Sequence, residues 1–160
     1  MTRTNPLHLV LLAVLGGGLA WFLETALAAT GNAIVIPPVT LGAALLLIAV
    51  IIVLMALPVR PVSRGVPNAR IDPFYATRVV LIAKASSLGG ALLAGAGLGI
   101  IAYLLSRSVL PGVGSMTMAL ASTVGAILLL TAGLIAEHMC SIPPDDENPQ
   151  DKRPTPERLS

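Results

Sequence analysis

Four long apolar runs with very few charges divide this chain, and they constrain its fold more than any other feature. They cover about residues 6–29, 39–57, 78–105 and 116–139. A helix rises about 1.5 Å per residue, so each run is long enough to cross the roughly 30 Å core of a bilayer. Helices are expected because lipid offers the backbone no hydrogen-bond partners. The runs predict an all-α integral membrane bundle of four antiparallel transmembrane helices.

Composition excludes an ordinary soluble domain. Only 11% of the 160 residues are charged, whereas soluble domains have about 25%. The single cysteine, Cys140, cannot form an intrachain disulfide. The sequence has no nucleotide-binding loop, no metal-ligand spacing and no acid–base pair typical of catalysis. It therefore predicts no enzyme activity, no cofactor, no metal and no nucleic-acid partner.

The basic residues predict the orientation, because cytoplasmic loops are rich in Lys and Arg. They gather before the first run, between the second and third runs, and in the polar, proline-rich tail 141–160, which we expect to be disordered. This predicts that both termini lie in the cytoplasm. A cleavable signal peptide ending near Ala28 is an alternative for the first run. Four arginines are candidates for contact with anionic lipid headgroups: Arg60, Arg64, Arg70 and Arg78.

The third run carries a ladder of small residues spaced four apart. Residues with this spacing lie on one face of a helix, and small faces let helices approach closely in lipid. The face predicts helix packing, and both a homo-oligomer interface and packing within one bundle remain open. The candidate helix-packing face consists of Ala83, Ser87, Ala91, Gly95 and Gly99.

Two charges in the apolar runs, Lys84 and Glu137, are expected to lie in the same cytoplasmic third of the membrane. A lone charge there is costly, so we predict an intramembrane ion pair, with snorkelling of Lys84 to the interface as the alternative. Glu24 and Arg107 could form a looser pair at the outer face, close to water. Haem ligation by the two histidines of the chain has no other support in the sequence.

Several short motifs, in order, resemble a known family. They are "LPVR" at 57–60, "RIDPFYATR" at 70–78, "AKAS" at 83–86, "AGLIAE" at 132–137 and "CSIPPDD" at 140–146. The chain resembles an actinobacterial four-span family known as domain of unknown function 3180. The resemblance implies a small plasma-membrane protein, generally found near folate-biosynthesis genes, with no assigned activity. Lys84, Glu137 and Cys140 match the family's pattern, without a role being implied.

We therefore expect a non-enzymatic accessory or interaction protein of the plasma membrane. Its partners would be membrane lipids and another membrane protein or a second copy. It would dock through the small-residue face, the basic loop or the tail. The alternative function is a small oligomeric transporter or channel-like subunit that uses Lys84 and Glu137.

Overall fold

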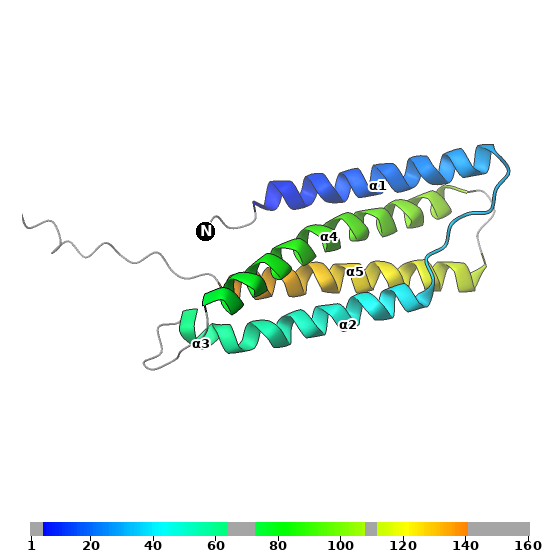
Figure 1. Cartoon of the computed structure of the whole chain (residues 1–160). Helices are drawn as coiled ribbons and strands as arrows, with labels where there is room; N and C mark the ends of the chain where they lie inside the picture. Colours follow the sequence, from blue (N-terminus) through cyan, green and yellow to red (C-terminus); the bar gives the residue numbers. More distant parts are fainter. Residues whose placement is uncertain (1–4, 64–72, 108–111, 141–160) are drawn as a thin grey trace, which may run out of the picture.

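The computed structural model of the chain describes residues 5–63, 73–107 and 112–140, which are mostly helical. Figure 1 shows four long helices, which are α1 (Pro6–Ala29), α2 (Val39–Ala56), α4 (Pro73–Ser106) and α5 (Val113–Cys140). Two short turns follow α2, namely η1 (Leu57–Val59) and α3 (Arg60–Ser63). The four long helices are apolar enough to cross a membrane, α2 together with η1. They confirm the predicted all-α, four-helix architecture and are as expected of a multi-pass membrane protein.

Proline and glycine mark the ends of the helices. Pro6 and Pro73 are the first residues of α1 and α4, where the missing N–H would have no helical partner anyway. Just beyond α1, Gly31 has a φ of 73°, a conformation that glycine adopts readily at a helix C-terminus. The backbone N–H of Asn32 then donates to the carbonyl of Leu27 at 3.0 Å. These local signals end α1 and begin the non-helical segment 32–38.

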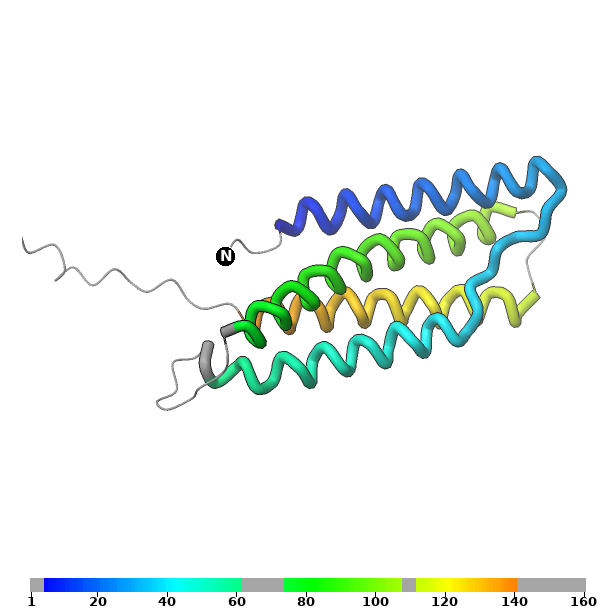
Figure 2. The backbone as a smooth tube through the Cα atoms, viewed as in Figure 1, coloured from blue at the N-terminus to red at the C-terminus, as the bar shows by residue number. Residues whose placement is uncertain are grey.

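The four long helices lie in a row in the order α1, α4, α5, α2, as Figures 1 and 2 show. α4 and α5 form the middle of the row, α1 packs on α4, and α2 packs on α5. α1 and α2 follow each other in the chain but occupy opposite edges, joined by segment 32–38. Because direction alternates along the chain, the packed neighbours α1 and α4 run parallel, and so do α2 and α5.

Small side chains fill the helix contacts, and large apolar side chains point outward. Ala83 and Ala136 are completely buried, whereas Phe22 is 72% exposed and Leu81 is 63% exposed. This distribution is the reverse of that in a soluble protein. It suits lipid, where outward apolar side chains are solvated and small residues allow close backbone packing.

Candidate functional site

The predicted helix-packing face of α4 is covered inside the chain by two different helices. At one end it meets α5. A Cβ atom placed on Gly133 would lie 2.7 Å from the backbone nitrogen of Ser87 and 2.9 Å from the carbonyl oxygen of Ala83. Ala91, further along α4, is 1% exposed. α5 is therefore seated against the backbone of α4.

At its other end the same face meets α1. Gly95 lies directly against the backbone of Ala13, and Gly99 lies against that of Gly17. The five small residues therefore serve two interfaces within one chain. A surface for a partner must consequently lie elsewhere on the row.

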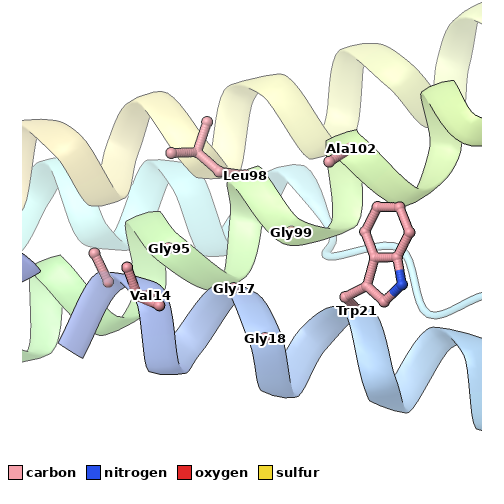
Figure 3. A pocket seen from close by; sticks show the side chains of 9 residues that line it. Val14, Gly17, Gly18, Trp21, Gly95, Leu98, Gly99 and Ala102 are labelled. Carbon is pink, nitrogen blue, oxygen red and sulfur yellow. The ribbon is translucent and has the colours of Figure 1, made fainter. Parts of the chain in front are cut away.

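Two apolar grooves follow the junctions at the edges of the row. The first, of about 500 Å³, runs between α1 and α4, and Figure 3 shows Trp21 at one end of it. The second, of about 420 Å³, runs between α2 and α5. No residue that lines either groove is ionisable. The grooves are therefore suited to apolar groups and offer no acid–base chemistry.

Eight residues in the lining of one groove correspond in position to eight residues in the lining of the other. The α1 residues Val14, Gly17, Gly18 and Trp21 match the α2 residues Val39, Gly42, Ala43 and Leu46, each 25 positions further along. The α4 residues Gly95, Leu98, Gly99 and Ala102 match the α5 residues Ala121, Val124, Gly125 and Leu128, each 26 positions further along. The offset is constant between α1 and α2 and constant between α4 and α5. This indicates that the α1–α4 half and the α2–α5 half of the row have equivalent structures.

The glycine contacts beneath the two grooves repeat in the same way. A Cβ on Gly99 would meet the carbonyl oxygen, Cα and carbonyl carbon of Gly17, and one on Gly125 would meet the same three atoms of Gly42. The distance to the oxygen of Gly42 would be 2.7 Å. A pseudo-two-fold axis therefore relates the α1–α4 pair to the α2–α5 pair. This axis exchanges α4 with the antiparallel helix α5, and α1 with α2, so it runs perpendicular to the plane of the row. Rotation about such an axis does not exchange the two faces of the row, and both grooves therefore open on the same face.

The axis passes through the tightest part of the α4–α5 interface. Thr123 on α5 is 26 positions beyond Gly97 on α4, so the axis relates these two residues to each other. They are in contact, because a Cβ on Gly97 would run into the Thr123 side chain. The Thr123 hydroxyl donates to the carbonyl of Ala119 on its own helix at 2.7 Å. The polar group is thus satisfied locally, and the centre of the molecule is a packed contact.

Glu24, near the end of α1, is only 1% exposed. The backbone N–H of Val35 donates to its carboxyl group, and Oε2 has no hydrogen-bond partner among the described residues. Glu24 is therefore buried, not close to water as expected, and the loose pair with Arg107 that the sequence allows is not formed. The Arg107 guanidinium instead donates to the Tyr103 hydroxyl at 2.6 Å and stacks over its ring, with 5.2 Å to the ring centre. Segment 32–38 covers Glu24, which sequence spacing does not reveal.

Lys84 and Glu137 lie on the adjacent helices α4 and α5, and both side chains are half-buried. Contacts between the helices set their relative level, because Gly90 faces Leu130 and Gly133 faces Ser87. Extending this antiparallel register places Glu137 level with the turn of α4 that contains Lys84. Glu137 has an interaction partner, and its ion pair with Lys84 stays a prediction.

The remaining candidates are spread over the surface. Arg60 and Arg78 are exposed at the end of the row where α2 ends and α4 begins, which we call the basic end. Arg64, Arg70 and the tail 141–160 lie outside the described residues.

His8 and His138 are exposed on α1 and α5, which do not pack side by side. Cys140 is a buried free thiol. Within the described ranges, no cluster of side chains could hold a metal ion.

Comparison with known proteins adds one finding. A family model described as "Protein of unknown function (DUF3180)" matches residues 9–144. No curated protein matches the chain, and no solved structure matches it.

Proposed function

The chain belongs to the DUF3180 family of proteins of unknown function, and on that basis we propose that it is a non-enzymatic accessory protein of the plasma membrane. It would hold helices of a partner membrane protein in its two equivalent grooves. The observation that supports this most is the pair of matching, uncovered grooves on one face of the row. α1 packs on α4 and α2 packs mainly on α5, so these two helices form the edges of the row.

The chemistry of the groove floors favours a helix as the occupant. Gly18 and Ala43, at equivalent positions, are exposed in the grooves, and a Cβ added to Gly18 would meet nothing within 4 Å. Small residues of this kind let another helix approach the backbone closely in lipid. Because the pseudo-two-fold axis reverses helix direction, the grooves present the same surface to helices that run in opposite directions. The partner would therefore contribute an antiparallel pair of helices.

The proposal includes the orientation predicted from the sequence. The basic end would face the cytoplasm, with Arg60 and Arg78 exposed at the membrane surface. Each arginine near an anionic leaflet contributes about 1 kcal/mol of attraction. Contact with anionic headgroups would keep the row upright, with its groove face directed along the membrane plane toward a partner.

A small transporter is the second candidate, and one observation favours it. Pseudo-two-fold axes in the membrane plane are common in secondary transporters, whose substrate sites lie where the two halves meet. Here that junction is occupied by the contacts of Gly97 with Thr123 and of Gly90 with Leu130. Lys84 on α4 is six residues from Gly90, and Glu137 on α5 is seven residues from Leu130, both toward the basic end of the same interface. The accessory role therefore accounts for more of the structure.

Site-specific photo-crosslinking in cells tests the proposal. A photoreactive amino acid at position 18 or 43 should capture one and the same partner, because the two sites are equivalent. The controls are Leu19 and Leu47, which are 61% and 60% exposed on the same helices but line neither groove. Labelling of lipid alone at all four positions would refute the docking role. Adducts between two copies of this chain would show that the grooves hold helices of a second copy.

A further inference from the structure

Glu24 is the one buried charged side chain in the described part of the protein, and it lies where three parts of the chain meet. It is one turn beyond Ala20, on the face of α1 that packs on α4. Ala20 and Ile34 both pack against a buried apolar cluster in α4 and α5 that contains Leu104. Ile34 belongs to segment 32–38, and the N–H of the next residue, Val35, donates to the Glu24 carboxyl. The carboxyl group thus links α1 to the segment that crosses the row.

Among the described residues, no positive charge is directed at this carboxyl group. Arg107, which follows the last residue of α4, is engaged with Tyr103, whose ring also packs edge-on against Trp21, with 5.8 Å between the ring centres. The first turn of α5, segment 32–38 and the last turn of α1 contain no other ionisable residue. Removing a carboxylate from water without a nearby cation is strongly unfavourable.

We propose that Glu24 is a proton-binding site that fastens segment 32–38 to α1, and that loss of its proton to water releases the segment. The neutral acid keeps one oxygen as an acceptor for a backbone N–H, and its hydroxyl is the atom without a partner. After ionisation the carboxylate must reach water, which requires the covering segment to move. Because this segment joins α1 to α2, proton binding controls how firmly the two edges of the row are connected. The inference does not depend on the proposed docking role.

Infrared spectroscopy of the full-length protein in lipid vesicles tests the protonation directly. At neutral pH the protein should show the carbonyl stretch of a carboxylic acid, which lies above the amide band. Glu24→Gln should remove this signal, and Glu137→Gln, the matched control, should retain it. If Glu24→Gln instead removes a carboxylate signal at neutral pH, the proposal is wrong.

Hydrogen exchange at the backbone amide of Val35 tests whether segment 32–38 is released. The natural protein alone gives the decisive result, so no variant has to fold for the test to work. In the natural protein, protection relative to the intrinsic exchange rate should fall by about tenfold per pH unit over the range in which the released carboxyl group has lost its proton and the covered one still holds it. Glu24→Gln, a neutral acceptor, should keep Val35 protected over the whole pH range, and Glu24→Ala should lose protection at every pH. Asn32, whose N–H donates to the carbonyl of Leu27, is the internal control. Protection of Val35 that does not vary with pH in the natural protein would overturn the proposal.

Discussion

At the scale of single residues, Lys84 and Glu137 show how the charges of a membrane bundle are placed. Their helices are held in register by glycine contacts, and the register brings the two side chains to one level near the basic end. Lys84 is half-buried and has a long aliphatic stem, so it can pair with Glu137 or extend its ammonium group to the interface. The half-buried position of Lys84 is compatible with both arrangements. Exchanging the charges of Lys84 and Glu137 distinguishes them.

We predict that Lys84→Glu and Glu137→Lys each reduce the stability of the protein, because each places like charges on facing helices. The loss should be on the order of 2.5–3.5 kcal/mol, the cost that insertion scales give for a charge at the bilayer centre. The double exchange should recover much of the loss, measured as thermal unfolding in detergent. A double variant no more stable than the worse single variant would show that the residues are not partners.

At the scale of elements, α1 depends on α4 alone, because α4 is its one packed neighbour in the row. Only Gly16 and Glu24 of α1 are buried, so the helix has little other contact to retain it. The α1–α4 junction rests on glycine backbones in direct contact, where a side chain cannot be accommodated by rotation. α2, at the opposite edge, packs mainly on α5 and is also held to α4, because the Tyr75 hydroxyl donates to the carbonyl of Met55 at 3.2 Å.

Gly99→Leu should therefore weaken the attachment of α1 to α4, because the new side chain meets the backbone of Gly17. Overpacking of this kind destabilises proteins by roughly 1–3 kcal/mol. The matched control is Gly89→Leu on the same helix, since a Cβ at Gly89 meets nothing within 4 Å. Cysteine crosslinking between α1 and α4 should drop in the first variant and persist in the second. Equal crosslinking in both would contradict the glycine contact.

At the scale of the whole molecule, the row has a basic end and an opposite end that holds Glu24 and Arg107. We predict that the basic end is cytoplasmic, because the cytoplasmic side retains most Lys and Arg. Reporter fusions after Arg64 and after Ser160 should both report the cytoplasm, and a fusion within segment 32–38 should report the outside. An external signal from either of the first two fusions would overturn the four-span topology.

The sequence by itself determined the number, type and approximate limits of the helices. The lengths of apolar runs and the positions of Pro6, Pro73 and Gly31 are local properties, and they act before any tertiary contact forms. The ladder from Ala83 to Gly99 also marked a closely packed face. Its partners could not be read from the sequence, because a ladder has the same spacing whether α1, α5 or another chain covers it.

Only the tertiary structure decided the order of the helices, the equivalence of the two grooves and the burial of Glu24. The physical reason is that these helices are apolar all round, since lipid and protein interior are both apolar, so no hydrophobic stripe identifies the buried face. The separation of α1 from α2 depends on the contacts of Gly17 with Gly99 and of Gly42 with Gly125, and the partners in each contact are far apart in the chain. Glu24 is enclosed because segment 32–38 has to cross the whole row to reach α2, a consequence of helix order that no local pattern contains.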